Sequence, residues 1–398
     1  MFQLRPFQKE ALSALKTPGH VLCIAPTGSG KSLIYERFVE QNPRSKALLI
    51  TPLLALARQQ RERLMKLPNK VILGVGVSRE KPPAYEPAIW IASPESLMHP
   101  IRHSALELWS PDFLIVDECH CLWEWGEQFR PAFSRIPELL GIGSFHRSLW
   151  LTATLPRDAR KDLRTRLPSP LTEIGSFELP SELMLQVSRV PWPDRAEALL
   201  RWISIQAGAG IVFVSTREAT LKLTRILQSI GKNAISYHAG LSNEERQSIE
   251  NMISQRKTDV IVATSAFGMG MDHAHLRWAA LWQAPSTLLS LAQAIGRVGR
   301  SSSRANALVL WDDDDFRLIE WTIQGSGRRR RELLEVYRFL HSDSCRRNAL
   351  KHYFGDRSAS ETCGKCDYCC HRQTPSTPSV YSEMTGRSVQ SERNLLQS

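Results

Sequence analysis

Short apolar runs that alternate with amphipathic segments constrain the fold of this chain more than any other feature. Each run is long enough for one buried strand, and the segments between the runs, such as 53–67, have the spacing of a surface helix. This alternation is typical of a parallel β-sheet that helices cover on both faces. The strands predicted in the first half of the chain are 20–25, 47–51, 88–93, 113–117 and 148–154.

The same pattern starts again in the second half. Between the two series, 175–194 carries the prolines of a linker. The predicted fold class is therefore α/β, with two tandem parallel-sheet lobes joined near residue 178. A helical stretch with a cysteine cluster follows, and then a polar tail predicted to be disordered. The strands predicted in the second lobe are 210–215, 233–239, 259–264, 278–283 and 306–311.

The chain has a formal net charge of +11 over 398 residues, which favours a polyanionic partner. Nucleic acid is the first candidate and an acidic membrane surface the second, although solubility alone would also explain a basic chain. The first residues have no apolar core of signal-peptide length, and no apolar run is long enough to span a bilayer. We therefore expect a cytoplasmic protein, associated with the nucleoid if the source is bacterial.

A phosphate-binding loop is predicted from "APTGSGKS" at 25–32, which directly follows the first predicted strand. Gly28 and Gly30 let the backbone curl so that its N–H groups face phosphate oxygens. Lys31 would reach the β- and γ-phosphates of ATP, and Ser32 would bind Mg²⁺. The other loop residues predicted to bind the nucleotide are Thr27 and Ser29.

Two carboxylates, Asp117 and Glu118, stand at the end of the apolar run "FLIV". Ligands of open α/β sheets bind at this end of the strands. We predict that Asp117 holds Mg²⁺ and that Glu118 polarises the attacking water as a general base. The adjacent Cys119 and Cys121 are predicted to be packing residues, because neighbours on a strand end cannot converge on one metal ion.

The segment "DECHCLWEWGEQFRP" at 117–131 closely resembles the RecQ family of superfamily 2 DNA helicases. The resemblance gives His120 a place in the catalytic motif. It also implies an aromatic loop that couples bound DNA to ATP hydrolysis, with Trp125, Phe129 and Arg130 on its functional positions. Rings beside an arginine make a stacking platform for unpaired bases. Core packing is the alternative for Trp125 and for Trp123.

Other motifs extend the resemblance over nearly the whole chain to about Cys369. The segment 4–12 resembles the adenine-reading motif, 51–60 and 92–98 resemble motifs that touch the DNA backbone, and 151–156 resembles the motif that couples the two lobes. The residues to which the resemblance gives a role are Arg5 and Gln8 at adenine, Arg217 and His238 on the DNA strand, and Gln293, Arg297 and Arg300 in a motif whose arginines reach the γ-phosphate.

The cysteine cluster near the end of the chain predicts a structural zinc site. A CxxCxxC run with one more cysteine upstream can close a tetrahedral thiolate site. The predicted ligands are Cys345, Cys363, Cys366 and Cys369, as the resemblance also implies. Cys370 is the alternative fourth ligand, and a redox-active CxxC pair is the alternative function.

The resemblance implies a function and a division of the chain. We expect two RecA-like lobes at 1–177 and 178–325, a small helical zinc-binding subdomain at 326–370 and a disordered tail at 371–398. The tail is too short for the winged helix and the further helical domain of longer family members. The predicted cofactors are ATP, Mg²⁺ and Zn²⁺, and the predicted partner is single-stranded or tailed duplex DNA.

The predicted function is that of a monomeric ATP-dependent helicase that moves 3′ to 5′ on DNA and unwinds duplexes in repair or recombination. The alternatives are a single-strand translocase or remodelling ATPase that needs a protein partner to unwind, for example in defence against foreign DNA, and a DNA-binding scaffold with an inactive motor. An RNA helicase is a further alternative. Two charge runs have open roles: the acidic run 312–315 is a loop or a helix start, and the arginines 328–331 contact phosphates or form a solvated face.

Overall fold

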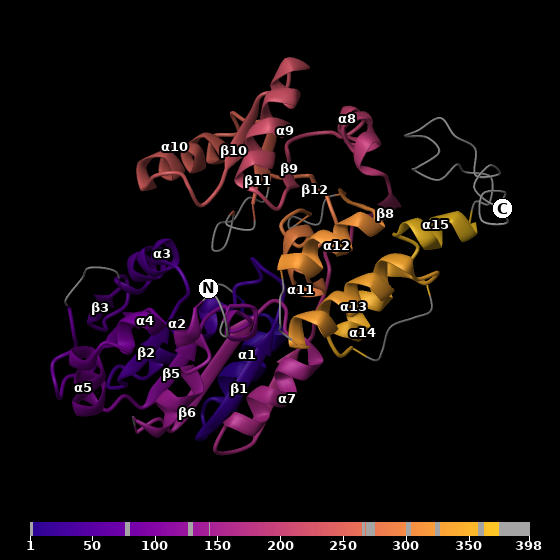
Figure 1. Ribbon diagram of the computed structural model, residues 1–398. Coiled ribbons are helices and arrows are strands. Elements are labelled where there is room, and N and C mark those ends of the chain that lie inside the picture. The colour runs from indigo at the N-terminus through magenta and orange to yellow at the C-terminus, as the bar shows by residue number, and fades with distance from the viewer. Residues whose placement is uncertain are drawn as a thin grey trace. The chain divides into compact units, whose positions relative to one another are not determined.

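The computed structural model describes residues 3–75, 80–125, 130–142, 144–264, 267, 275–299, 304–322, 327–356 and 362–373, without the side chains of 243, 321, 322 and 371–373. The chain divides into two compact units, Met1–Glu178 and Leu179–Ser398 (Figure 1). Each unit is built around one parallel β-sheet. No helix in the described ranges is both long enough and apolar enough to cross a bilayer.

The sheet of the first unit has the order β3-β4-β2-β5-β6-β1-β7, and every strand pair in it is parallel. Because the strands are parallel, the segments that follow them all begin at one edge of the sheet. The strands are β1 (Gly19–Ile24), β2 (Ala47–Ile50), β3 (Val71–Gly74), β4 (Ile89–Ala92), β5 (Phe113–Val116), β6 (Arg147–Thr152) and β7 (Leu171–Gly175).

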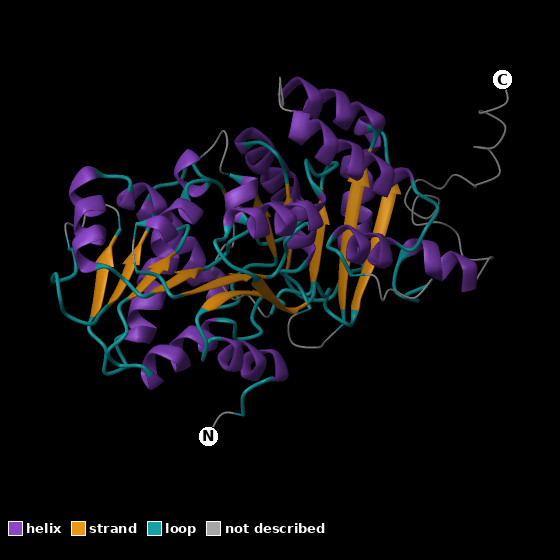
Figure 2. Ribbon diagram, turned by 90° about the horizontal axis from the view of Figure 1, so that it is seen from below, coloured by secondary structure: helices purple, strands orange, loops and turns teal. Residues whose placement is uncertain are grey.

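Helices lie on both sides of this sheet (Figure 2). They are α1 (Pro6–Ala14), α2 (Ser32–Gln41), α3 (Leu54–Leu64), α4 (Pro94–Leu97), α5 (Pro100–Trp109), α6 (Cys121–Glu124) and α7 (Arg157–Arg166), with 3₁₀ turns at Pro131–Phe133 and Ile136–Gly141.

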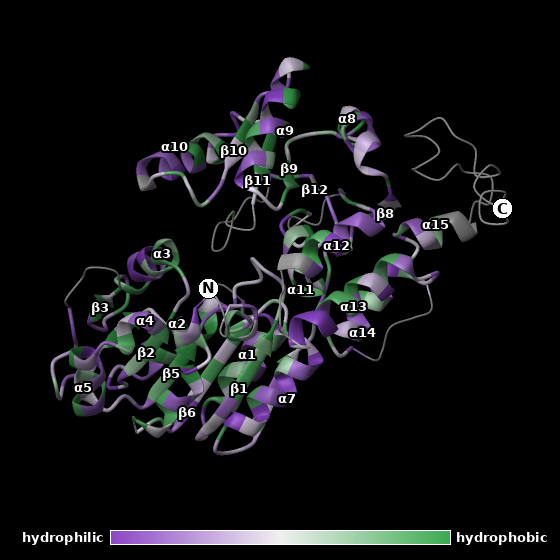
Figure 3. Cartoon of the chain, viewed as in Figure 1, coloured by the Kyte–Doolittle hydropathy of each residue, from purple (hydrophilic) through white to green (hydrophobic). Residues whose placement is uncertain are grey.

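The central strands of the first unit are buried on both faces. In β5, Leu114 and Val116 belong to one core cluster, whereas Phe113 and Ile115 belong to the cluster on the other face. Successive side chains of a strand point to opposite faces, so a strand covered on both sides is apolar throughout. The green strands of Figure 3 show this continuous hydrophobicity, which explains why the sequence contains uninterrupted apolar runs.

The sheet of the second unit has the order β10-β11-β9-β12-β13-β8, and its strand pairs are also parallel. The strands are β8 (Leu183–Arg189), β9 (Gly210–Phe213), β10 (Ala234–Tyr237), β11 (Val260–Ala263), β12 (Trp278–Leu281) and β13 (Ala305–Trp311). The helices are α8 (Arg195–Ser204), α9 (Arg217–Ser229), α10 (Asn243–Ser254), α11 (Leu288–Ile295), α12 (Asp313–Thr322), α13 (Gly327–His341), α14 (Arg346–Tyr353) and α15 (Asp367–Gln373), and a 3₁₀ turn lies at Trp192–Asp194.

A buried ion pair joins α8 to α12. The Arg195 guanidinium donates to both carboxylate oxygens of Asp315 (2.9 and 3.0 Å), and both side chains are fully buried. Asp315 also accepts hydrogen bonds from the backbone N–H groups of Ala284 and Asp312. A buried pair of this kind is tolerated because every charge has several partners. The last residue of the acidic run therefore has a structural role, and the run begins a helix, which was one of the two predicted options.

The predicted α/β fold with two parallel-sheet lobes is confirmed, and all ten predicted strands are present within two residues of their predicted bounds. The prediction that 175–194 is a linker is partly wrong, because β8 lies inside it and pairs with β13. This edge strand mixes buried, half-buried and exposed residues instead of being buried throughout. The strands β3 and β7 were also missed. The predicted disordered tail is wrong for 371–373, which belong to α15, and the rest of it lies outside the described residues.

Candidate functional site

The predicted phosphate loop lies between β1 and α2. Gly28 and Gly30 have φ values of 76° and 85°, a left-handed backbone that favours glycine. A side chain at Gly30 would also meet the Gln8 amide nitrogen at 2.9 Å. The buried Lys31 ammonium donates to the carbonyl oxygens of Ala25 (2.9 Å) and Pro26 (3.2 Å). The loop therefore has the curl and the charge that suit a phosphate group.

Two more polar groups line this loop. The Ser29 hydroxyl is buried and has no hydrogen-bond partner among the described residues, which fits a group that a ligand would satisfy. Ser32 is the first residue of α2, so it lies at the positive end of the helix dipole. Thr27 lies in the turn that precedes Ser29.

Gln8 is buried against the loop. Its Nε2 donates to the Gly30 carbonyl (2.8 Å), and its Oε1 accepts from the Arg5 backbone N–H (2.8 Å). Gln8 therefore ties the start of α1 to the phosphate loop. The contact of Gln8 and Arg5 with adenine stays a prediction.

The carboxylate of Asp117 is buried directly after β5. Burial first, and the charge of Glu118 second, raise the pKa of Asp117 well above its usual range, and the Lys31 charge opposes this rise. Asp117 Oδ1 accepts from the Glu118 backbone N–H (3.0 Å). Glu118 itself has a φ of 51°, a strained conformation for a residue with a side chain. A buried carboxylate with so few hydrogen bonds and so little positive charge around it is suited to binding a cation such as Mg²⁺.

Gln60 is a candidate site residue that the sequence analysis did not single out. It lies on α3, its side chain is buried, and its Nε2 donates a long hydrogen bond to Asp117 Oδ2 (3.4 Å). Its Oε1 is buried without a hydrogen-bond partner in the described part of the chain. The signal available in the sequence was a glutamine on the apolar face of α3, next to the buried positions Leu56 and Ala57.

His120 connects Glu118 to the end of β6. Its Nδ1 is 3.1 Å from Thr152 Oγ1 and 3.3 Å from Glu118 Oε2. The Thr152 hydroxyl donates to the Thr154 carbonyl (2.9 Å), so it accepts from His120. This network assigns the Nδ1 proton to the hydrogen bond with Thr152, and it leaves Glu118 beside the imidazole edge.

The residues after His120 are packed more tightly than a free aromatic loop would be. Trp123 Nε1 donates to Asp162 Oδ2 on α7 (2.8 Å). Trp125 is half-buried, and its ring meets Phe133 edge-on at 5.6 Å between centroids. Phe129 lies outside the described residues. The packing alternative therefore holds for Trp123, and Trp125 combines core packing with partial exposure.

Arg130 has internal partners that the sequence could not show. It donates to both carboxylate oxygens of Glu95 (2.6 and 2.8 Å) and to the Pro52 carbonyl (2.6 Å). Its guanidinium carbon lies 4.5 Å from the Phe133 ring centroid. Arg130 thus joins the aromatic segment to the two segments predicted to touch the DNA backbone.

In the second unit the structure brings Arg217 and His238 together. Both side chains crowd Gly240: an added Cβ there would lie 3.0 Å from Arg217 Nη1 and 3.3 Å from His238 Nδ1. His238 Nδ1 is buried without a hydrogen-bond partner among the described residues. The pair follows β9 and β10, so it lies at the carboxyl edge of the second sheet.

The predicted γ-phosphate motif is described only in part. Gln293 belongs to α11 and Arg297 follows its end, and both are half-buried. Arg300 lies outside the described residues. The role of this motif stays a prediction.

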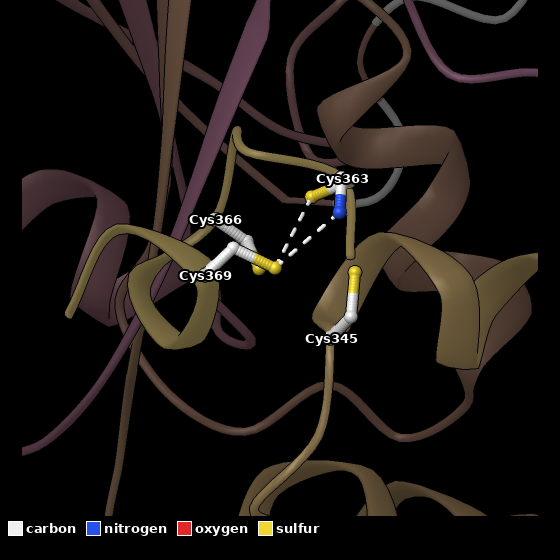
Figure 4. A group of neighbouring side chains, drawn as sticks. All are labelled: Cys345, Cys363, Cys366 and Cys369. Atoms are coloured by element: carbon white, nitrogen blue, oxygen red, sulfur yellow. Dashed lines mark hydrogen bonds between the residues drawn. The ribbon is translucent and has the colours of Figure 1, made fainter. Parts of the chain in front are cut away.

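The four cysteines predicted as zinc ligands form one cluster. The sulfur atoms of Cys345, Cys363, Cys366 and Cys369 lie within 4.8 Å of one another. Their side chains converge from the start of α14, from the turn before α15 and from α15 itself (Figure 4). Thiolates about 2.3 Å from a tetrahedral zinc lie about 3.8 Å apart, and Cys363 Sγ is 3.9 Å from Cys369 Sγ. The residues therefore fit Zn²⁺. Cys370 is not a member of this group.

The cysteine cluster is attached to the edge strand β8. Leu185 pairs with Cys366 in an isolated parallel bridge, and the Leu185 N–H donates to the Lys365 carbonyl (3.0 Å). Arg347 donates to the carbonyl oxygens of Leu183 (2.6 Å) and Pro180 (3.1 Å). The cluster thus covers an edge that would otherwise expose unpaired backbone groups.

We predict that Asp117→Asn stabilises the protein in the absence of Mg²⁺ and nucleotide. The folded-state pKa of Asp117 is raised from 3.8 to about 7, so the folded wild-type protein loses stability as the pH rises through this window. Asparagine removes the buried charge. The variant's gain should be absent below the lower pKa and reach about 4 kcal/mol above the upper one, since each unit of pKa shift corresponds to about 1.4 kcal/mol.

Thermal unfolding of both proteins across this pH range measures the gain. The control is Asp158→Asn, whose side chain is 95% exposed and whose replacement should give no gain in stability that grows with pH. A gain that is equally large at both ends of the pH range, or a loss at high pH, would contradict this account of Asp117.

We predict that Cys363→Ser lowers the zinc content well below one ion per chain, whereas Cys370→Ser leaves it unchanged. The first variant removes a sulfur from the tetrahedron, and the second removes a thiol that lies beside it. Elemental analysis of the purified proteins gives the zinc content. Because the cluster holds β8, the Tm of Cys363→Ser should also fall by about 5–10 °C. The reverse order of the two variants would make Cys370 the ligand.

Comparison with known proteins identifies three domains along the chain. Residues 5–163 match the DEAD/DEAH box helicase family, 194–302 match the helicase conserved C-terminal domain, and 313–370 match the RecQ zinc-binding domain. The last match contains all four clustered cysteines, and the first contains the phosphate loop and the Asp117–Glu118 pair.

Curated relatives carry the same combination. The chain is 28% identical to the ATP-dependent DNA helicase RecQ of Pasteurella multocida over 92% of its length, and 29% identical to the ATP-dependent DNA helicase Q5 of Rattus norvegicus over 92%. It spans 60% of the first relative and 42% of the second.

Solved structures share the fold. A structure of Saccharomyces cerevisiae Dbp5 bound to RNA and ADP BeF3 superimposes with a TM-score of 0.61 at 16% identity, covering 90% of this chain and 93% of that one. The Mycobacterium smegmatis helicase Lhr bound to ssDNA and AMP-PNP gives 0.61 at 24% identity, with 85% and 50% covered. Two parallel-sheet lobes that match helicase domains, followed by a four-cysteine element that matches the RecQ zinc-binding domain, give this chain the domain order of the RecQ helicases to which it is similar.

Proposed function

We propose that this protein is an ATP-dependent DNA helicase that moves 3′ to 5′ along single-stranded DNA and unwinds duplexes, with a role in DNA repair or recombination. The observation that carries the proposal is the buried Asp117 carboxylate beside a strained Glu118 and near the Lys31 charge. The family relatives named above are DNA helicases. The predicted monomeric state and cytoplasmic location belong to the same proposal, as do lobes at 1–177 and 178–325.

In the proposed reaction, Lys31 and the loop N–H groups hold the phosphates of ATP. Ser32 and Asp117 hold Mg²⁺, which neutralises phosphate charge when bound. Glu118 takes a proton from the attacking water, and the His120 imidazole lies beside its carboxylate at 3.3 Å. We propose that the motif of Gln293, Arg297 and Arg300 contacts the γ-phosphate, as the sequence predicts.

Contacts with the DNA strand are proposed at two places. Arg217 and His238 offer a cation and a polar nitrogen side by side at Gly240, which suits a phosphate. The partly exposed Trp125 offers a ring for a base, with Phe129 as a second predicted ring. Because Arg130 is paired with Glu95, we propose that it positions the aromatic segment in addition to any contact with DNA.

The first test is Glu118→Gln, which should reduce DNA-stimulated ATP hydrolysis by about 10²-fold or more. DNA binding should survive, because Glu118 is not one of the residues predicted to bind DNA. Glu138→Gln, an exposed glutamate paired with Arg135, is the matched control and should retain full activity. ATP hydrolysis at the parental rate in Glu118→Gln would remove Glu118 from the reaction.

Strand displacement on 3′-tailed, 5′-tailed and blunt duplexes tests direction and unwinding. The proposal requires displacement of the 3′-tailed duplex with ATP. Hydrolysis without displacement would favour the translocase or remodelling ATPase that needs a partner. DNA binding without hydrolysis would favour the inactive scaffold.

The second prediction concerns Gln60, which we propose as a positioning residue for Asp117. Gln60→Ala should raise the Mg²⁺ concentration for half-maximal ATP hydrolysis by about 10-fold, because partners of a metal ligand have effects of this size. Gln59→Ala, the exposed neighbour on α3, is the control. An unchanged Mg²⁺ requirement with a lowered maximal rate would show that Gln60 acts only on the fold.

A further inference from the structure

One face of α13 is basic and apolar at the same time. The opposite face packs into the second unit through Leu333, Val336, Phe339 and Leu340. The exposed residues Arg330, Arg331, Leu334, Tyr337 and Arg338, together called the α13 stripe, form a single line. At 100° per residue they lie within an arc of about 120°, and the line is about 12 Å long.

The α13 stripe differs from an ordinary solvated helix face in its apolar content. Leu334 is 53% exposed and Tyr337 is 44% exposed. Leu318 of α12, which packs on α13, is also half exposed (Figure 1). Large apolar side chains gathered on one face next to cations indicate a contact surface more than a surface that only faces water.

The charge of the α13 stripe is only partly neutralised. Glu335 pairs with Arg338 (2.7 Å), and Glu332 pairs with Arg328 outside the stripe (3.2 Å). Within the described ranges, no ion pair involves Arg330 or Arg331, which are neighbours on the exposed face. The stripe therefore presents at least two guanidinium groups to a partner with negative charge.

Tyr337 is held in place and one face of its ring is covered. The ring stacks on His341 at 3.8 Å between centroids with an angle of 27°, and it meets Phe316 edge-on at 5.2 Å. His341 Nε2 is in turn 3.2 Å from Asp313 Oδ1. Platforms for unpaired bases need open aromatic faces. A ring that is half covered and fixed is better suited to packing against a sugar.

We propose that the α13 stripe binds the sugar–phosphate backbone of double-stranded DNA. The arginines lie on one face of a rigid helix, and one strand of a duplex offers them a fixed row of phosphates that are about 3.4 Å apart along the axis. The arginines contact phosphates, and Leu334 and Tyr337 pack against deoxyribose. The inference rests on the proposed function only in taking DNA as the polyanion. It gives Arg330 and Arg331 of the 328–331 run a role in binding duplex DNA.

The test compares Arg330→Ala/Arg331→Ala with the control Arg44→Ala/Lys70→Ala in the full-length protein without nucleotide. Arg44 and Lys70 are exposed and precede β2 and β3, at the edge of the first sheet opposite the phosphate loop. Affinity for a blunt duplex and for a single strand of equal length is measured over a salt series. Each lost phosphate contact lowers the slope of log K against log salt by about one.

The stripe variant should bind the duplex with a slope smaller by about two, keep its single-strand affinity and keep its single-strand-stimulated ATP hydrolysis. The control variant should have the same duplex slope, single-strand affinity and stimulated ATP hydrolysis as the parent protein. An unchanged duplex slope, or a loss that falls on the single strand instead, overturns the proposal. Binding is measured without ATP, so the duplex-binding result can be interpreted even if the protein proves not to be a helicase. An unchanged duplex slope would in turn leave the proposed ATP-driven function untouched.

Discussion

The buried charge of Asp117 is the constraint on which the candidate site of the first unit depends. Among the described residues its carboxylate accepts one hydrogen bond from a backbone N–H and one long bond from Gln60, and neither donor carries a charge. Lys31 is near enough to oppose the rise in its pKa, but the ammonium donates to loop carbonyls. A buried charge with so little compensation is unfavourable. The site therefore gains free energy when a cation enters, so nucleotide-bound Mg²⁺ would complete the electrostatic balance of this unit.

The second unit depends on its cysteine cluster in a comparable way. The chain enters this unit along 180–185, and Arg347 and the Lys365–Cys366 backbone hold that segment by hydrogen bonds. The position of the edge strand β8 is therefore linked to a group of thiols about 180 residues later in the sequence. Thiolates repel one another unless a cation lies between them. A bound zinc would thus stabilise the sheet edge as well as the helices that carry its ligands.

Strands could be predicted from the sequence where burial on both faces requires apolar residues at every position. Strands covered on both faces are apolar throughout, so β5 and β12 could be located from their runs. Strands β3, β7 and β8 lie at or next to sheet edges, mix exposed and buried positions, and so resemble loops. For the candidate site, motif spacing located the phosphate loop and the four cysteines. It could not locate Gln60, because its importance comes from a carboxylate 57 residues away that only folding brings within 3.4 Å.

The pairing of Arg130 with Glu95 was equally hidden, and together with Gln60 it gives the proposed coupling a physical path. The start of α3 is reached through Pro52, whose carbonyl accepts from Arg130. Later on the same helix, Gln60 donates to Asp117. A helix of 11 residues is about 16 Å long and moves as one body. A strand of DNA that displaces the segment around Trp125 and Arg130 would therefore move α3, and with it the amide that contacts Asp117, the proposed magnesium ligand. Contact with DNA and readiness for hydrolysis would then depend on the position of one helix.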